Sequence, residues 1–229
     1  MSQLIDNLNI IESVKTDIKT AIENKGVDMT GVSFPGYASK IGEISGGGGW
    51  DQKSLTEGTN IIINLYNSAS FVASNAFYLN NTIQTVNLPY ATTVGESAFR
   101  GCTSLSQVSL PVCEYIKSNA FNYCISLSQV SLPVCSYIGS NVFNQCSSLS
   151  QISLPVCSYI DNYVFRNCSS LSIITIGYSG VCSFPYSNAF FNTKITSSTG
   201  SIYVPASLVD SYKSATNWSY FSTQIFPIE

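Results

Sequence analysis

Apolar positions recur along this chain with a fixed period of 22 residues. One column is phenylalanine, at Phe77, Phe99, Phe121, Phe143 and Phe165. A second column is leucine followed by proline, at Leu88, Leu110, Leu132 and Leu154. A constant period of roughly 20 to 50 residues is typical of a solenoid, in which each repeat forms one coil. The pattern therefore predicts regular stacked coils from Ile83 to about Asn192.

Within each coil, alternating polar and apolar residues predict one short strand that a proline ends. Val108 and Leu110 should point inward and Ser109 outward, because side chains alternate along a strand. Ile116 and Phe121 are expected to point inward from the opposite side. The remaining core columns are Ile83, Leu105, Leu127, Leu149 and Leu171, and Val86, Val108, Val130, Ile152 and Ile174. One coil buries too little to fold alone, so stability must come from stacking.

Both ends of the array depart from the period. Ile61 lies 22 residues before Ile83, which predicts a degenerate first coil with a strand through Leu65. Phe190 follows Phe165 by 25 residues, which predicts an enlarged loop. A last strand over 202–204 and a helix over 206–216 should then form an atypical terminal cap. The side chains expected to cover the open end are Leu208, Val209, Tyr212, Trp218, Phe221, Ile225, Phe226 and Ile228.

The first 45 residues follow a helical period, with apolar residues at threes and fours over residues 2–25. A second, shorter helix is expected over 33–45, and Gly46–Gly49 form a flexible joint. Two interpretations of the first helix stay open. It packs on its own chain, or it is a docking or oligomerising helix near the minimum length of a coiled coil. The second interpretation predicts a homo-oligomer, with a trimer favoured, held by Leu4, Leu8, Ile11, Val14, Ile18 and Ile22.

These patterns together predict four parts of the chain. Residues 1–45 form a helical anchoring or oligomerisation segment, and residues 46–51 form a Gly-rich linker. Residues 52–204 form the solenoid, and residues 205–229 form the C-terminal cap.

Charge and composition narrow the possible partners. Charged residues make up only 10% of the chain and the net charge is −3, without a basic run, which argues against a nucleic-acid partner. No apolar stretch approaches the ~20 residues that a membrane-spanning helix needs, so no membrane insertion is expected. The N-terminal sequence MSQLIDNLNI lacks the features of a secretory signal. We therefore expect the protein to stay in a cytosol until something else releases it.

Seven of the eight cysteines fall into two repeat columns. These columns are Cys102, Cys124, Cys146 and Cys168, and Cys113, Cys135 and Cys157, and only Cys182 lies outside them. Periodic placement predicts small buried side chains that fill one position in each coil. Disulfides between stacked coils are compatible with the coil spacing, but parallel Cα–Cβ bonds give them a poor dihedral angle, so free thiols are expected. Without histidine or a CxxC pair, no metal site is expected.

The sequence carries no catalytic or cofactor-binding pattern. The chain has no histidine, which excludes a Ser-His or Cys-His nucleophile pair. Between Ile83 and Ile176 the acidic residues lie in different coils, without the paired arrangement of a glycosidase. Gly46–Gly49 lack the Lys and Ser/Thr of a phosphate-binding loop. We therefore expect a protein that is not an enzyme and needs no cofactor.

Two sets of outward side chains are candidates for binding. The first is an uncharged row able to hydrogen-bond glycans or protein loops: Thr85, Asn87, Gln107, Ser109, Gln129, Ser131, Gln151 and Ser153. The second is a tyrosine column able to stack on sugar rings or anchor a partner: Tyr115, Tyr137 and Tyr159. Each set also has a plainer interpretation, as a polar ladder that keeps the repeats soluble or as tyrosines that pack along the coil edge. The sequence leaves both alternatives open.

The repeat resembles the BspA-like leucine-rich repeat. The features in common are L-x-x-V-x-L-P, a following Ile, and N-x-F-x-x-C, over roughly residues 61–204. The ending VPASLVDSYKSATNWSYFSTQIFPI is similar to the terminal cap common in that family, although the unit here is one residue shorter than usual. The resemblance implies a mainly β solenoid of leucine-rich-repeat type with a terminal cap. Together with the helices expected over 2–25, 33–45 and 206–216, the predicted fold is a mainly β solenoid with an N-terminal α-helical segment and a C-terminal helical cap. It also implies a role in adhesion or protein interaction.

A second resemblance concerns the segment IKTAIENKGVDMTGVSFPGYASKIGEI. It is similar to short N-terminal segments of bacteriophage tail-fibre and appendage proteins. This implies a structural protein located in the virion, whose N-terminal helices dock on other virion proteins and whose repeats attach to a host surface glycan or protein. The alternatives are a bacterial BspA-like surface or host-interaction protein, and a purely decorative virion component.

Overall fold

Residues 70–229, with Glu23 and Thr30, are the part of the chain that the computed structural model describes. The expected N-terminal helices, the glycine joint and the strand at residues 61–65 lie outside the described residues. The division of the chain into four parts stays a prediction.

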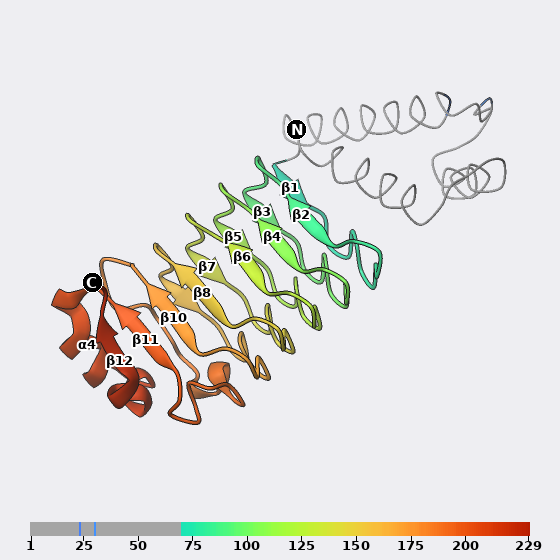
Figure 1. Ribbon diagram of the computed structural model, residues 1–229. Helices are drawn as coiled ribbons and strands as arrows, with labels where there is room; N and C mark the ends of the chain where they lie inside the picture. The colour runs from blue at the N-terminus through green and yellow to red at the C-terminus, as the bar shows by residue number, and fades with distance from the viewer. Residues whose placement is uncertain (1–22, 24–29, 31–69) are drawn as a thin grey trace. The chain divides into compact units, whose positions relative to one another are not determined.

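Residues 70–229 form a parallel-strand repeat fold of stacked coils (Figure 1). The regular coils each give two short strands, and every pairing between strands is parallel. The first series of strands is β1 (Phe71–Val72), β3 (Thr93–Val94), β5 (Tyr115–Ile116), β7 (Tyr137–Ile138) and β9 (Tyr159–Ile160). The second series is β2 (Thr85–Asn87), β4 (Gln107–Ser109), β6 (Gln129–Ser131), β8 (Gln151–Leu154), β10 (Ile173–Ile176), β11 (Ser201–Val204) and β12 (Ile225–Pro227).

The core is built from the predicted columns. The phenylalanine rings from Phe77 to Phe165 stack with centroids 4.9–5.7 Å apart and interplanar angles of 4–8°. The expected 25-residue step is confirmed as well, because the Phe165 ring stacks on Phe190 at 5.6 Å. The short helix η3 (Ser187–Phe190) lies in the enlarged loop. Except for Val130, every expected core residue between Ile83 and Ile174 is buried.

Left-handed backbone conformations turn the chain before each phenylalanine. One such column, with φ between 55° and 61°, is Asn75, Ser97, Asn119, Asn141 and Tyr163. Asparagine tolerates this region better than most residues, which explains why it recurs here. The turns also join the coils, since the Phe121 N–H donates to the Val142 carbonyl at 3.0 Å and its equivalents repeat this bond.

The cysteine column that follows each phenylalanine does more than fill space. The Cys124 thiol donates to the Phe99 carbonyl at 3.1 Å, and three equivalent bonds measure 2.9–3.3 Å. Because the accepting phenylalanine belongs to the preceding coil, each thiol links two coils through a weak hydrogen bond. All eight cysteines are free and buried, as the sequence predicts.

The C-terminal cap differs from the predicted helix over 206–216. It begins with the 3₁₀ turn η4 (Ala206–Leu208), continues as α4 (Val209–Ser214), and ends where Ala215 becomes extended at φ −70° and ψ 149°. After η5 (Trp218–Gln224), the chain returns as β12, which pairs with β11 and was not predicted.

The side chains that close the end of the array are therefore fewer than expected. Tyr212, Trp218, Phe221 and Ile225 are buried, whereas Leu208 and Val209 are half-buried. The prediction that Phe226 and Ile228 complete the seal is wrong, because both are exposed. In a strand, the side chain next to a buried one points to the opposite face, so burial of Ile225 puts Phe226 outside.

The second series of strands forms two sheets. One has the order β2-β4-β6 and the other β12-β11-β10-β8, whereas the first series runs unbroken from β1 to β9. Val130 lies on β6 beside the break and is half-buried, where the sequence predicts a core residue. Val86 and Val108 each have a paired strand on the side where Val130 faces the unpaired β8.

Candidate binding site

The outward side chains of β2, β4, β6 and β8 form one uncharged surface. This Gln/Ser face consists of Thr85, Asn87, Gln107, Ser109, Gln129, Ser131, Gln151 and Ser153. All are exposed except Ser109, which is half-buried, so the predicted outward orientation agrees with the structure. Parallel pairing in register places identical residues side by side on neighbouring strands, with Gln107 beside Gln129 and Ser109 beside Ser131. A role of these side chains in binding stays a prediction.

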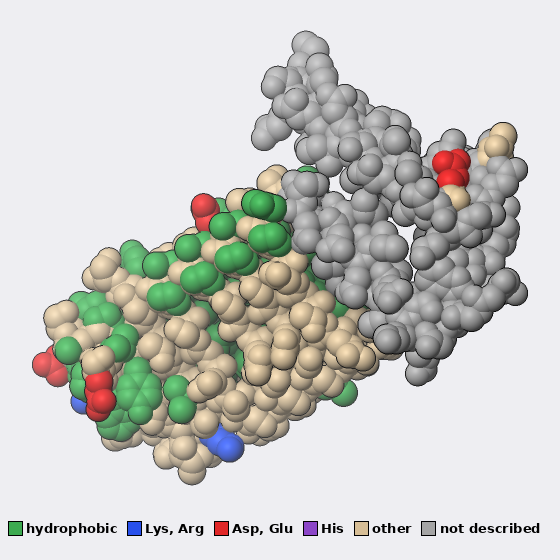
Figure 2. Space-filling view, turned by 45° about the horizontal axis from the view of Figure 1, so that its top comes forward, with side chains coloured by type: hydrophobic (Ala, Val, Ile, Leu, Met, Phe, Trp, Pro, Cys, Tyr) green, Lys and Arg blue, Asp and Glu red, His purple; other side chains and the backbone are tan. Residues whose placement is uncertain are grey.

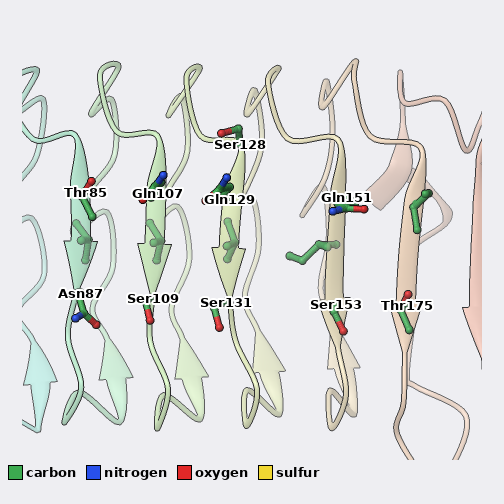
Figure 3. A pocket seen from close by; sticks show the side chains of 15 residues that line it. Thr85, Asn87, Gln107, Ser109, Ser128, Gln129, Ser131, Gln151, Ser153 and Thr175 are labelled. Carbon is green, nitrogen blue, oxygen red and sulfur yellow. The ribbon is translucent and has the colours of Figure 1, made fainter.

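The Gln/Ser face is hollowed. A cavity of about 720 Å³ is open along it, and the glutamines and serines project from successive strands in two rows (Figure 3). Ser128, Ile173 and Thr175 also line the cavity, although they are not among the predicted binding residues. The 22-residue period contains the missing signal, because Ile173 continues the glutamine column and Thr175 continues the serine column.

Among the described residues that line this cavity, none carries a charge. Amides and hydroxyls both donate and accept hydrogen bonds, so the surface suits a neutral ligand with alternating donors and acceptors. Ile173 is 39% exposed and adds one apolar contact. The cavity offers hydrogen bonds and shape, without an ionic anchor.

The tyrosine column lies on the other series of strands, on β5, β7 and β9. Tyr115 is exposed, whereas Tyr137 and Tyr159 are half-buried and stack on each other at 5.1 Å. Burial and the Asp161 carboxylate raise the pKa of both stacked phenols above the ordinary value, which keeps them neutral. The two candidate sets therefore occupy different sheets, and the structure does not bring them together.

A further column of exposed apolar residues follows the Leu-Pro pairs. These residues, from 39% to 64% exposed, are Tyr90, Val112, Val134 and Val156. Figure 2 shows hydrophobic side chains gathered in short parallel rows, on a described surface that carries few charges. In the sequence, this column is one more position of the 22-residue repeat.

A family model for the BspA type leucine rich repeat region, in six copies, matches residues 92–212. This match covers just over half of the chain. The chain belongs to this family. The match begins at β3 and ends within the cap, so it includes the tyrosine column and the part of the Gln/Ser face from Gln107 to Ser153, whereas Thr85 and Asn87 lie before it.

Solved structures with the same kind of repeat were also found. A leucine-rich repeat protein of T. pallidum is 34% identical, covering 46% of this chain and 51% of its own, with a TM-score of 0.45. A leucine rich cell surface protein of Faecalibacterium prausnitzii is 20% identical, covering 69% of this chain and 42% of its own, with a TM-score of 0.50. The chain thus spans about half or less of these relatives. No match was found among curated protein sequences.

The cysteines of the BspA-type repeats are poor candidates for chemistry. Burial raises the pKa of the Cys102 and Cys113 thiols to about 11, so almost no thiolate forms near neutral pH. Cys157 differs, because a hydrogen bond from Cys182 lowers its pKa. Within residues 70–229 no group of three or more acidic or cysteine side chains is arranged to hold a metal ion.

The helices of the described region do not reach membrane-spanning length and apolarity. The longest, η5, has seven residues and includes polar side chains. Of these helices, η4, α4 and η5 belong to the C-terminal cap, and η3 lies in the enlarged loop.

Proposed function

We propose that this chain is a non-catalytic binding domain of the BspA-like surface-protein type, which attaches to its partner through the Gln/Ser face. The observation that carries the proposal is the cavity of about 720 Å³, lined by the same uncharged side chains at successive 22-residue steps. A row of polar side chains that only kept the repeats soluble would not need a cavity, nor an exposed isoleucine such as Ile173 in its lining. Family membership supports the same reading, because BspA-like repeats are associated with adhesion and protein interaction.

The surface-protein part of the proposal is supported by one relative in particular. The Faecalibacterium prausnitzii protein is a cell surface protein by name, and its fold extends over 69% of this chain. Since the identity is 20%, we use this relative as support for location and carry over no partner.

Charge placed on the Gln/Ser face tests the proposal. The full-length chain with Gln107→Arg, Gln129→Arg and Gln151→Arg should bind a panel of epithelial and bacterial cells at least about tenfold more weakly than the parent. Three guanidinium groups would fill and charge a cavity that is uncharged now. Flow cytometry of labelled protein measures the binding, and circular dichroism checks that the variant is folded.

A matched control places the same charge elsewhere. Val112, Val134 and Val156 are 39–41% exposed and also recur at 22-residue steps. The triple Val→Arg chain should bind as the parent does. Undiminished binding by the Gln→Arg chain, or loss confined to the Val→Arg chain, would contradict a binding role for the Gln/Ser face.

A second candidate function is the phage virion appendage predicted from the N-terminal segment. It rests on that sequence resemblance alone, and the family match and the structural relatives favour the surface-protein proposal over it. Docking on other virion proteins and a homo-oligomer, with a trimer favoured, belong to this candidate. Deletion of residues 2–25 should then leave a folded monomer by light scattering, and an oligomer that survives the deletion would contradict the assigned role of the helix.

A further inference from the structure

The sheet behind the Gln/Ser face is open between β6 and β8. Within residues 70–229, no backbone hydrogen bond joins these two strands, although β6 pairs with β4 and β8 pairs with β10. At the preceding interface, the Leu110 N–H donates to the Ser131 carbonyl at 3.1 Å. The equivalent bond from Leu132 to Ser153 is not formed.

The residues that directly precede β6 and β8 are also not hydrogen-bonded to each other. The Ser128 N–H donates to the Ser106 carbonyl at 3.0 Å, and the Ser172 N–H donates to the Ser150 carbonyl at 2.9 Å. In both cases the serine hydroxyl bonds the same carbonyl at 3.3 Å. Ser150 makes neither bond to Ser128. Backbone donors and acceptors at both ends of β6 and β8 thus lack the partners that their repeats have.

The opening is a wedge confined to this face. On the other side of the same coils, β7 pairs with β9, and the Phe143 N–H donates to the Val164 carbonyl at 2.9 Å. Figure 3 shows the strand that carries Gln151 and Ser153 standing apart from the strand that carries Gln129 and Ser131. The opening therefore faces the cavity on the Gln/Ser face.

The break coincides with a change in the core. The inward residue of β2, β4 and β6 is valine, whereas that of β8 and β10 is isoleucine. Strands with the same inward residue pair, and the one interface that joins Val130 to Ile152 does not. Closely packed interiors respond to a single methylene, and the larger Ile152 side chain first appears at the junction where the strands separate.

We propose that this opening is a binding slot for hydroxyl groups of a neutral carbohydrate chain that lies along the Gln/Ser face. The proposal rests on the proposed function and names the ligand class of that surface. A hydroxyl both donates and accepts, so it bonds the Leu132 N–H and the Ser153 carbonyl that face the slot. Gln129 and Gln151 flank the slot and offer amide groups to neighbouring hydroxyls.

A carbohydrate fits the slot better than a peptide strand does. Insertion of a strand needs two strand spacings, about 9.6 Å, between β6 and β8. The paired β7 and β9 hold the same two coils at one spacing. The absence of charge along the cavity also disfavours anionic glycans and charged peptides.

Amide exchange tests whether the slot exists in solution. In the full-length chain, the Leu132 and Ser150 amides should exchange at least about tenfold faster than Leu110 and Ser172, which occupy equivalent positions in bonded coils. NMR of the ¹⁵N-labelled protein measures the four rates. Equal protection of all four amides would overturn the proposal.

Titration with neutral oligosaccharides tests the ligand. Maltohexaose, cellohexaose, chitohexaose and mannohexaose are the probes, with sialyllactose and an uncharged Gly/Ser peptide as contrasts. At least one neutral probe should shift the Leu132 and Ser150 amides saturably. No saturable shift with any neutral probe, shifts spread evenly over all coils, or stronger shifts with the peptide would each overturn the proposal.

Two conservative variants complete the test. Ile152→Val should close the strand ladder, restore amide protection and weaken oligosaccharide binding by about tenfold or more, because the bonds that the hydroxyls make are replaced by backbone bonds. Ile174→Val removes the same methylene at a paired interface and should bind as the parent. An Ile152→Val chain that binds as tightly as the parent would overturn the proposal. If the parent chain binds cells but no oligosaccharide, only the carbohydrate-slot proposal fails. The Gln→Arg chain separately tests whether the Gln/Ser face binds the cells.

Discussion

The phenylalanine stack offers the sharpest test of how the array is held together. Phe143 is fully buried in the middle of the stack, with its ring 5.7 Å from both Phe121 and Phe165. Phe143→Ala should lower the free energy of unfolding by about 3–5 kcal/mol, because a buried ring is lost and the stacked coils cannot collapse into the cavity. Against a typical total of about 5–15 kcal/mol, this is a large fraction.

The position of Phe143 adds a second expectation. Each coil contacts only its neighbours, so a weak coil in the middle uncouples the two ends. In a Trp50→Phe background, Trp218 is the one tryptophan left, and it reports the C-terminal end. Urea unfolding followed by far-UV circular dichroism and by Trp218 fluorescence should give coincident curves for the parent and separate curves for Phe143→Ala.

The control is an aromatic side chain that stacks on nothing in the core. Tyr220 is 74% exposed, so Tyr220→Ala should change stability by no more than about 0.5 kcal/mol. A Phe143→Ala chain as stable as Tyr220→Ala would refute the stacked-core reasoning. Coincident curves for Phe143→Ala would refute the nearest-neighbour reasoning alone.

Four further predictions concern local features. Tyr123→Asn should stabilise the fold by about 0.5–1 kcal/mol in urea unfolding, since Tyr123 has φ 62° and asparagine holds the same column at Asn167; an unchanged midpoint would contradict this. Tyr212→Phe should cost about 1–3 kcal/mol, because its hydroxyl accepts from the Cys182 N–H at 2.9 Å and donates to the Gly180 carbonyl at 3.2 Å; an unaltered Tm would argue against it. Seven thiols have a pKa raised by the fold from the ordinary 9.0, to about 11 at Cys102 and Cys113. The stability that these protonated thiols give the folded state is therefore present below pH 9 and is lost as the pH rises towards 11. The Tm of the protein should fall over that range. At pH 8 the thiols of the native chain should not react with iodoacetamide until the chain unfolds, as measured by mass spectrometry. Fast labelling of the native chain would contradict the burial of the thiols.

Periodicity made most of the coil predictable. A residue that recurs every 22 positions in a stack meets its own copy, so the burial of Phe121 and Leu110 and the outward direction of Gln107 followed from the sequence. The same reasoning placed the 25-residue step before Phe190. The hydrogen bond of the cysteine thiol was missed, because a small apolar side chain would give the same periodic pattern.

Features that occur once were harder to predict. β12 pairs with β11 because the cap brings residues 225–227 back to the sheet edge. These residues are not part of the 22-residue repeat, so its period does not predict the contact. The break between β6 and β8 coincides with the change from Val130 to Ile152, which adds one methylene and looks conservative in the sequence. The hollow on the Gln/Ser face depends on how the strands are spaced, and a list of outward residues does not give that spacing.

The register of the coils has a genetic consequence. Because residue i meets residue i+22 within the regular coils, a duplication or deletion of one whole unit there joins partners that are already complementary. Unequal recombination between such repeats would lengthen or shorten the array by one strand spacing of about 4.8 Å while its stacking contacts are kept. Copies of valine coils extend the three-stranded sheet and copies of isoleucine coils extend the four-stranded one. Arrays of different length would therefore still contain a single valine-to-isoleucine junction.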